Sequence, residues 1–477
     1  MHAATKDSTP GYTASAPANM LFVFAIVAVA TIGGFMFGYD SGVINGTQDG
    51  LQRTFNLTRL ETGFNVAAIL VGCAVGAFIA GRLADLIGRR TVMIIAAIFF
   101  LLSALAAGDA PSSVVFIVAR FIGGLGVGAA SILCPAYISE VTPARSRGKL
   151  ASLQQVMIII GLTGAFLANY VLAKVAGGST AMLWLGYPAW RWMFWMQVVP
   201  AAIFLIMLLV IPESPRFLVS RGRLAQAQVV LTRIFGASEA QRKVEAIASS
   251  LATDQHRPKM SDLLDGAGRI RRIVWVGIGL AVFQQLVGIN VVFYYGTVLW
   301  ESVGFSESDS LFFNVVSGVL SIAACIFTIF TVDRIGRRPL LLIGSVGMAV
   351  TLGLVAAAFS TGSLVNGTLQ LPHAAGVLAL VSANLYVIFF NASWGPVMWV
   401  MLGEMFPNQI RGSGLAVAGF AQWMANYGIS VSFPMLASTV GLVVTYGFYA
   451  LSALVSFFFV RAMVHETRGM ELEQMHG

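Results

Sequence analysis

The sequence predicts an all-α membrane protein of twelve transmembrane helices, arranged as two six-helix pseudo-repeats with a helical linker between them. Of 477 residues, 57% are hydrophobic and only 10% are charged, whereas soluble domains carry roughly 25% charged residues. The apolar residues gather in runs of about 20, the length of a helix that crosses a bilayer. Two motifs also recur in the same order in both halves of the chain.

The recurring motifs indicate that the chain was built by duplication. Asp-Leu-Ile-Gly-Arg-Arg at residues 85–90 returns as Asp-Arg-Ile-Gly-Arg-Arg at residues 333–338, 248 positions later. A glutamate seven residues before an Arg-Gly pair occurs at residues 140–148 and again at residues 404–412, 264 positions later. Membrane transporters use such repeats to form two equivalent shapes, open first to one side and then to the other.

The apolar runs define the expected elements in order. The run that begins at Met20 is too long for the apolar core of a signal peptide and is expected to remain as the first helix. A first bundle, residues 20–212, is expected to hold helices near 20–45, 62–81, 91–108, 114–137, 149–172 and 191–212. A second bundle, residues 272–462, is expected to hold helices near 272–300, 311–332, 339–360, 375–403, 411–434 and 440–462.

The remaining segments are polar. Residues 1–19 and 463–477 are expected tails, and residues 213–271 are an expected linker with an amphipathic helix near 224–235. Most of the 29 lysines and arginines lie in the tails, in the linker and in the loops after every second helix. Because positive charge is retained on the cytoplasmic side, both termini and the linker are expected to be cytoplasmic. The net charge of +8 therefore reflects membrane orientation, and no nucleic-acid partner is expected.

Five segments in a fixed order carry a family resemblance. They are Gly-Arg-Leu-Ala-Asp-Leu-Ile-Gly-Arg-Arg at 81–90, Arg-Phe-Ile-Gly-Gly at 120–124, Pro-Glu-Ser-Pro-Arg-Phe at 212–217, Gln-Gln-Leu-Val-Gly-Ile-Asn at 284–290 and Gly-Pro at 395–396. Over about residues 20–470 the chain resembles the sugar porters of the major facilitator superfamily, among them the bacterial xylose–proton symporter. The resemblance implies the major facilitator fold and sugar transport.

Two ionisable residues fall inside expected helices. Asp40 lies near the end of the first helix, and Arg120 lies about two turns into the fourth. Charged groups at such depth usually face a cavity or each other. Burial favours the neutral form of a carboxylate, and a nearby guanidinium favours its charged form. A small change in the distance between Asp40 and Arg120 therefore decides whether the carboxylate binds or releases a proton. A permanent structural ion pair, or an aspartate that caps its helix, explains the same residues. The resemblance implies proton coupling, because mammalian facilitators have Asn in place of Asp40.

The expected substrate site is rich in amides. A sugar hydroxyl both donates and accepts hydrogen bonds, and the side-chain amides of Asn and Gln can also donate and accept. Six amides lie in apolar helices: Gln155, Gln284, Gln285, Asn290, Gln422 and Asn426. Ordinary hydrogen bonding between helices is the alternative explanation. Gln422 and Asn426 are four residues apart and share a helix face.

Two helices are expected to be interrupted near this site. Gln285 and Asn290 are five residues apart, about 140° around a regular helix, and converge only if the helix unwinds at Gly288. Gly395-Pro396 predicts an equivalent break in the tenth helix. Discontinuous helices are how transporters offer free backbone groups to a substrate.

The resemblance extends the list of candidate sugar contacts. It places contacts at Gln155, Gln284, Gln285, Asn290, Trp399 and Gln422, with Phe37, Tyr294 and Tyr295 lining or closing the cavity and Trp423 beside Gln422. Packing is the alternative role for these aromatic residues. Ser321 departs from the family, since the related xylose and glucose transporters carry Asn there. A hydroxyl in place of an amide leaves the sugar class unchanged and the particular aldose open.

The duplicated charges are expected to form a gate at the cytoplasmic helix ends. Its residues are Asp85, Arg89, Glu140 and Arg147 in the first half and Asp333, Arg337, Glu404 and Arg411 in the second. Ion pairs among them are expected to form when the cavity faces outward and to part when it faces inward. Enforcing membrane topology is the alternative role, because a single exposed pair contributes only about 0–1 kcal/mol.

These features favour proton-coupled symport of a monosaccharide such as glucose or xylose, with a proton-independent sugar facilitator as the alternative. Five scattered histidines and three isolated cysteines predict neither an enzyme nor a metal site, and no cofactor is expected. The expected partners are the sugar, protons and the lipid bilayer. A monomer in a bacterial inner membrane is expected.

Overall fold

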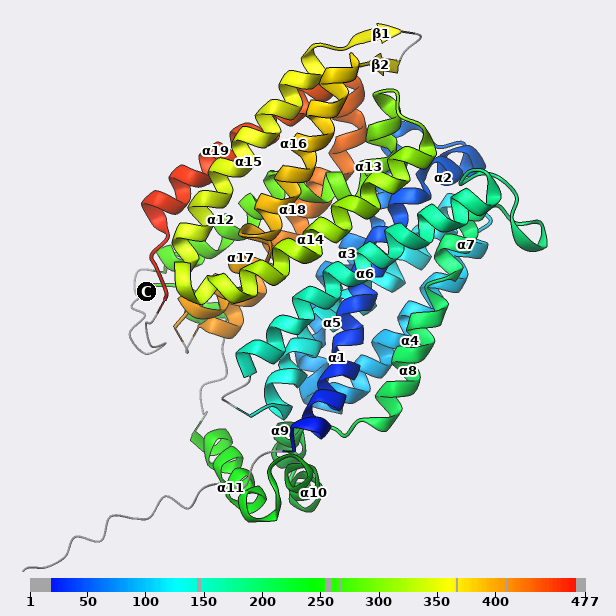
Figure 1. Ribbon diagram of the computed structural model, residues 1–477. Helices are drawn as coiled ribbons and strands as arrows, with labels where there is room; N and C mark the ends of the chain where they lie inside the picture. The colour runs from blue at the N-terminus through cyan, green and yellow to red at the C-terminus, as the bar shows by residue number, and fades with distance from the viewer. Residues whose placement is uncertain are drawn as a thin grey trace, which may run out of the picture.

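The computed structural model describes residues 19–143, 147–253, 260–265, 268–365, 368–407 and 410–468. The chain forms two helical bundles side by side, with three short helices beneath one end (Figure 1). The first bundle contains α1 (Met20–Gly42), η1 (Val43–Gly46), α2 (Gln48–Phe55), α3 (Arg59–Ile87), α4 (Arg89–Asp109), α5 (Ser113–Val141), α6 (Arg147–Ala176), η3 (Trp184–Gly186), α7 (Ala189–Trp195) and α8 (Val198–Val210).

The linker and the second bundle follow. The linker forms α9 (Pro215–Ser220), α10 (Leu224–Phe235), α11 (Ala237–Thr253) and η4 (Met260–Leu263). The second bundle contains α12 (Arg272–Leu286), α13 (Ile289–Ser302), α14 (Glu307–Ile335), α15 (Arg337–Ser360), the hairpin β1 (Ser363–Val365) and β2 (Thr368–Gln370), α16 (His373–Asn391), α17 (Trp394–Met405), α18 (Arg411–Thr439) and α19 (Gly441–Met463). The β1–β2 hairpin was not expected from the sequence.

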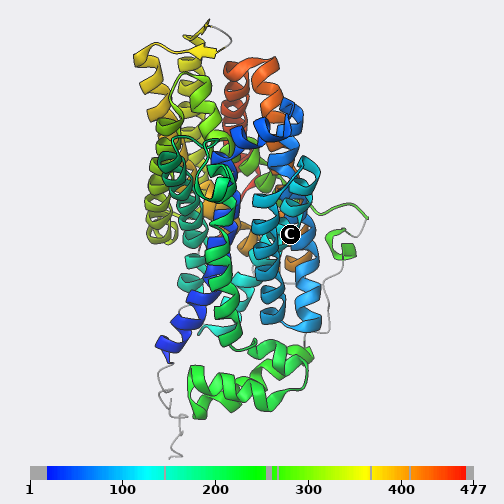
Figure 2. The same ribbon diagram turned by 90° about the vertical axis from the view of Figure 1, so that its right-hand side faces the viewer.

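The two ends of the molecule differ. The hairpin and α2 mark one end, called here the hairpin end, and helices α9 to α11 mark the opposite linker end (Figures 1 and 2). The linker helices lie under the first bundle, where the backbone N–H of Asn19 donates to the carbonyl of Ile234 at 2.8 Å. The amphipathic pattern predicted near 224–235 matches α10.

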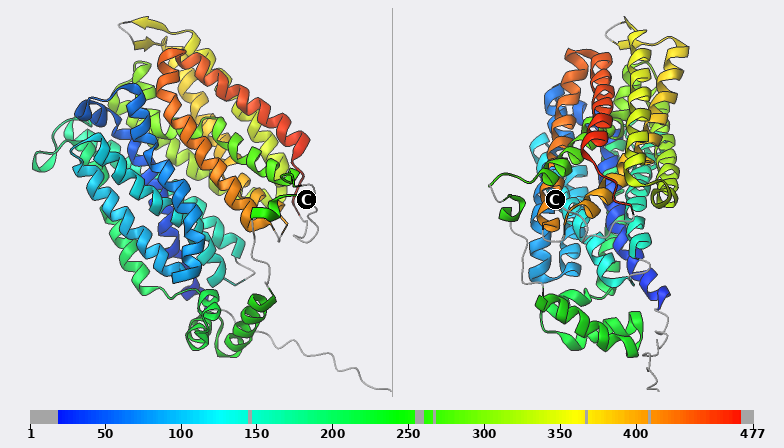
Figure 3. Two further views of the ribbon diagram at one scale, coloured as in Figure 1. Left: turned by 180° about the vertical axis from the view of Figure 1, so that it is seen from behind. Right: turned by 90° about the vertical axis from the view of Figure 1, so that its left-hand side faces the viewer.

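Eleven spans in the described residues are long and apolar enough to cross a membrane. Helix α18 is the twelfth. It runs for 29 residues beside α12 and α19 (Figure 3), but small and polar residues such as Gln422 and Asn426 lower its hydropathy. Its polar face is buried within the protein, which is where a membrane helix carries such groups. The twelve expected spans are therefore present.

The repeated Asp-x-x-Gly-Arg-Arg motif makes the same sharp turn in both halves. Gly88 separates α3 from α4 with φ +105°, and Gly336 separates α14 from α15 with φ +100°. Any residue that has a Cβ atom is strained at such φ values, so this position of the motif requires glycine. The following arginines begin the next helix in each half.

Three helices are interrupted, and not all where expected. The break between α12 and α13 at Gly288, with φ +80°, confirms the predicted one. The break expected at Gly395-Pro396 lies instead at Ala392 and Ser393, because a proline expels the helical carbonyl four residues before it. The expected helix at 191–212 is divided into α7 and α8 at Met196 and Gln197, which the sequence analysis did not predict.

The two halves pack against each other through α3 with α18 and through α6 with α14. Within the first half, α1 lies very close to α6. A Cβ atom added at Gly38 would lie 1.8 Å from the backbone oxygen of Ile158. Only glycine permits this approach, which brings the final turns of α1 into the middle of the molecule.

Candidate substrate and proton site

Asp40 and Arg120 form a buried ion pair between α1 and α5. The guanidinium of Arg120 contacts the Asp40 carboxylate and donates a second bond, of 2.8 Å, to the Asp40 backbone oxygen. Both residues are completely buried, and the guanidinium carbon lies 5.5 Å from the centre of the Phe194 ring. Within the described residues, Asp40 Oδ2 and Arg120 Nε have no hydrogen-bond partner. The carboxylate is thus held by the arginine and does not cap the end of its helix.

Four of the five predicted amides of the second half, all but Asn426, meet in one hydrogen-bonded cluster. Gln284 Oε1 accepts from Gln285 Nε2 at 3.2 Å and from Gln422 Nε2 at 3.3 Å. Asn290 Nδ2 donates to Gln285 Oε1 at 2.5 Å, across the break at Gly288. Three separate stretches of chain therefore present their amides to one another, as the interruption of the helix predicted.

Gln284 also joins this cluster to the second interrupted helix. Its Nε2 lies 3.1 Å from the backbone oxygen of Trp394 and 3.3 Å from that of Gly395. Gln422 Oε1 has no partner within the described part of the chain. A buried acceptor without a donor is costly, so this atom is available to a hydroxyl group of a ligand.

The aromatic candidates divide into two groups. Trp423 packs on Phe37 across the two halves, with 5.7 Å between ring centres. The Tyr294 hydroxyl lies 3.5 Å from Asn426 Nδ2 and lies near Ser41, next to Asp40. Tyr295 instead donates to the backbone oxygen of Ser430 at 2.7 Å. Tyr294 therefore connects the amide side of the site with the segment that carries Asp40.

Two other candidates stand apart from the cluster. Gln155 is half-buried on α6 and Trp399 is 37% exposed on α17. In the described residues neither side chain is hydrogen-bonded to the amide cluster. Their predicted contacts with sugar thus remain predictions.

Ser321 has a partner that the sequence analysis did not identify. Asn391, the last residue of α16, is 1% exposed and donates from Nδ2 to Ser321 Oγ at 3.2 Å. Its Oδ1 lies 3.5 Å from the position that a Cβ would occupy at Gly395, beside the carbonyl bonded by Gln284. An amide is therefore supplied from α16 next to the position where the related transporters carry one on α14. Asn391 lies inside the helix expected at 375–403, four residues before Gly395, and that position is the sequence signal for it.

A polar seal closes the hairpin end between the two halves. Asn45 Nδ2 donates to the Phe293 backbone oxygen at 2.7 Å, and Asn45 Oδ1 accepts from the backbone N–H of Thr297 at 2.9 Å. Asn314 Nδ2 lies 3.3 Å from the same Asn45 oxygen, and the Gln48 side chain donates to the Tyr294 backbone oxygen. No hydrogen bond between described residues of opposite halves lies at the linker end, so the closed end is the hairpin end.

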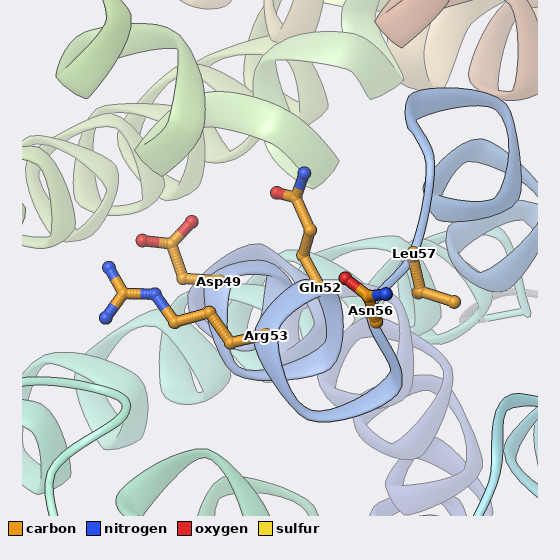
Figure 4. Close-up of a pocket in the computed structure, with 5 residues that line it drawn as sticks. All are labelled: Asp49, Gln52, Arg53, Asn56 and Leu57. Atoms are coloured by element: carbon orange, nitrogen blue, oxygen red, sulfur yellow. The ribbon is translucent and has the colours of Figure 1, made fainter.

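A shallow pocket of about 370 Å³ lies outside this seal. It is lined by Asp49, Gln52, Arg53, Asn56 and Leu57 (Figure 4). Burial and the nearby Glu307 carboxylate raise the pKa of Asp49 above its ordinary value, and Arg53 opposes this shift. Glu307 also accepts from the backbone N–H of Ser179 at 2.7 Å, a further bond between the halves.

Replacing Asn45 by alanine is expected to open the hairpin end. About three hydrogen bonds are lost at roughly 1 kcal/mol each, which moves the balance between closed and open states roughly a hundredfold toward open. Spin labels are placed at Arg53 and Ser308, both exposed. Double electron–electron resonance measures the distance between the two labels and is expected to show a new population at longer distance. Asn56→Ala, in the neighbouring pocket, is the matched control. An unchanged distance distribution in Asn45→Ala would contradict the seal.

The duplicated charges form two equivalent clusters at the linker end. Arg89 lies 2.9 Å from Asp85 and 3.3 Å from Glu140 in the first half. In the second half Arg337 lies 2.9 Å from Asp333 and 2.8 Å from Glu404. These pairs exist within each half while the hairpin end is closed. The ion pairs shown here thus lie inside each half, and the expectation that pairs among these residues part when the cavity faces inward stays a prediction.

Each cluster includes a second glutamate that the sequence analysis did not identify. Glu213 accepts from the backbone N–H of Arg90 at 3.0 Å, and Glu466 accepts from that of Arg337 at 3.0 Å. The sequence signal was a Glu-Ser or Glu-Thr pair after the last helix of each half. Arg411 donates to the Phe406 backbone oxygen at 3.1 Å, and the side chain of Arg147 lies outside the described residues.

Two six-helix bundles related by duplication, which enclose a buried ion pair and an amide cluster, define a membrane transporter for a polar solute. The family model described as "Sugar (and other) transporter" matches residues 26–477. The chain belongs to this family of sugar porters of the major facilitator superfamily, and it is a transporter, not an enzyme.

Relatives cover nearly the whole chain. The glucose transport protein of Synechocystis sp. is 49% identical over 459 residues, 96% of this chain and 98% of the relative. The D-xylose-proton symporter of Escherichia coli is 38% identical over 494 residues, 96% of each chain.

Solved structures of the E. coli xylose transporter XylE resemble the fold. Its inward open conformation gives a TM-score of 0.81 at 35% identity and covers 95% of this chain and 99% of that chain. The proton:xylose symporter bound to 6-bromo-6-deoxy-D-glucose gives 0.78 at 37% identity and covers 96% and 99%.

Proposed function

We propose that the chain couples the movement of a proton to the uptake of an aldose, glucose or xylose, by alternating access. The carrying observation is the buried Asp40–Arg120 pair, which Tyr294 connects through Ser41 to the amide side of the site. Sequence relatives described as a glucose transport protein and as a xylose–proton symporter support both parts of this proposal.

In the proposed cycle, Arg120 and a proton compete for the Asp40 carboxylate. When the cavity faces outward, a proton neutralises Asp40 and frees Arg120, and the sugar then binds to the amides. Closing the hairpin end brings Arg120 back to Asp40, which expels the proton toward the linker end. The present structure, with the ion pair formed and the hairpin end sealed, corresponds to the state after proton release.

The linker end is proposed to be cytoplasmic, as the distribution of Lys and Arg predicts. Both termini then lie in the cytoplasm of a bacterial cell, and the structure is the inward-facing state. The ion pair and the amide cluster are each completed by side chains of the same chain, and a monomer is proposed as the transporting unit.

Ser321 and Asn391 are proposed to set the choice of sugar together. Asn391→Ala removes the buried amide beside Ser321, and we expect the KM for the preferred aldose to rise about tenfold, since a lost hydrogen bond to a sugar hydroxyl costs about 1–1.5 kcal/mol. Ser321→Asn in that background returns an amide from α14 and is expected to recover part of the loss. Uptake of labelled glucose, xylose and galactose measures this, with Ser317→Ala on the same helix as control. Equal KM values in all four proteins would refute the assignment.

A proton-independent facilitator is the second candidate, favoured by the fact that the ion pair is buried and doubly bonded, as a permanent structural pair would be. Proteoliposomes with an internal fluorescent proton reporter distinguish the two. Symport predicts acidification of the lumen upon addition of sugar and faster uptake after an external pH drop. Sugar entry with no acidification would leave the facilitator as the function.

A further inference from the structure

A groove of about 690 Å³ lies at the linker end of the second bundle, away from the amide cluster and the ion pair. It is lined by Asp265, Arg269, Ile270, Arg272, Trp275 and Met463. Helix α12 begins at Arg272 and helix α19 ends at Met463, so the groove opens where two spans reach the membrane surface. Helix α12 lies between α18 and α19 on a face of the bundle that is seen directly in Figure 3.

A hydrogen-bonded turn fixes the basic wall of the groove. The backbone N–H of Arg271 donates to the carbonyl of Leu263 at 2.9 Å, and that of Asp265 donates to the carbonyl of Arg269 at 2.6 Å. These bonds hold Arg269 above the first turn of α12, and the groove is therefore a formed surface with a defined position.

The groove carries an excess of positive charge. The Arg269 side chain is 81% exposed and lies 3.4 Å from Asp265, the one acidic residue that lines the groove. Arg272 is exposed and forms no ion pair with any residue that the structure describes. The local charge complements an anion.

Beside the basic residues the groove has an exposed apolar wall. Trp275 is 54% exposed and Ile270 is 42% exposed. Arg272 and Trp275 are three residues apart, so they share a face of α12. Tryptophan is enriched at the membrane–water interface, where its ring sits at the level of the lipid headgroups.

We propose that this groove binds an anionic glycerophospholipid of the surrounding leaflet. Its phosphate lies between Arg269 and Arg272, and an acyl chain runs along Trp275 and Met463. A soluble anion would use the arginines but gain nothing from the exposed apolar wall, whereas a lipid uses both. Basic pockets at the ends of membrane helices bind anionic headgroups in this way.

Native mass spectrometry of the full-length protein with phosphatidylglycerol and phosphatidylcholine tests the proposal. The wild-type protein is expected to retain phosphatidylglycerol in preference to phosphatidylcholine. The double variant Arg269→Gln/Arg272→Gln is expected to bind phosphatidylglycerol at least tenfold more weakly, and Trp275→Ala is expected to weaken both lipids. Inorganic phosphate and glycerol 3-phosphate at millimolar concentration are expected not to displace the lipid.

Arg242→Gln is the matched control, because Arg242 is an arginine of α11 that is 73% exposed and pairs with Glu239 at 3.4 Å. It is expected to leave lipid binding unchanged. Thermal unfolding in phosphatidylcholine alone verifies that each variant is folded. If the double variant does not fold, the single variant Arg272→Gln is used in its place. Equal phosphatidylglycerol affinity in wild type and folded variants, or displacement by inorganic phosphate, would overturn the proposal.

Discussion

Asp40→Asn is expected to abolish uphill accumulation of sugar while exchange of sugar down its gradient continues. The amide is close in size to the carboxyl group but neither accepts nor releases a proton, so a proton gradient has nothing to act on. Removing the charge also weakens the attachment of α1 to α5, because Arg120 loses its ion pair and keeps only its bond to the backbone oxygen of residue 40. The ratio of internal to external labelled sugar in proteoliposomes with an imposed pH gradient is therefore expected to fall to about one.

Counterflow in the same vesicles is the companion measurement. Because unlabelled sugar loaded inside the vesicles drives the exchange and no proton gradient is needed, counterflow is expected to persist and to lose its dependence on external pH. Asp49→Asn is the matched control, since Asp49 is an aspartate of α2 outside the membrane spans and outside the seal. Undiminished accumulation in Asp40→Asn would remove the proton role from this residue.

Gln284→Ala is expected to cause the largest loss of sugar affinity among the amide variants. Gln284 Oε1 accepts from both Gln285 and Gln422, and its Nε2 reaches the backbone at the second helix break. Removing it takes one or two hydrogen bonds from the sugar site at about 1–1.5 kcal/mol each, so the KM is expected to rise by roughly 10- to 100-fold. Equilibrium binding of labelled sugar and uptake kinetics measure the effect.

Gln52→Ala is the control for Gln284, because Gln52 is a glutamine that lines the pocket outside the seal and is not bonded to the cluster. The melting temperature of each variant separates lost affinity from lost folding. A KM for Gln284→Ala within twofold of the wild-type value would show that the cluster only joins helices, the alternative that the sequence left open.

The interruption of the helix at Gly288 was predictable because two amides five residues apart could meet in no other way, and their bond at 2.5 Å follows from it. The break before Trp394 was placed three residues too late, since a proline disturbs the carbonyl four residues before it. Pro200 lies four residues after Met196 and is the sequence signal for the break at Met196 and Gln197, which the sequence analysis overlooked.

Asn45 and Asn391 show the limit of reading residues one by one. Each is a single amide in an apolar stretch, and each acquires its role from a partner 70 or more positions away: Ser321 for Asn391, at a separation of 70, and Phe293 for Asn45, at a separation of 248. The linker-end ion pairs were foreseen as a group of residues, but their division into two clusters within the halves was not.

The sequence by itself determined the twelve spans, the duplication and the presence of one acid and one base inside the spans of the first half. Hydrophobicity, helix length and motif order can be read from residues that are neighbours in the chain. A charged side chain inside the hydrocarbon region has few partners other than an opposite charge. The tertiary structure alone decided which end is sealed, which amides touch and where each arginine finds its carboxylate. Those outcomes depend on distances of a few ångströms between segments remote in the chain, and glycine contacts such as Gly38 on Ile158 set these distances.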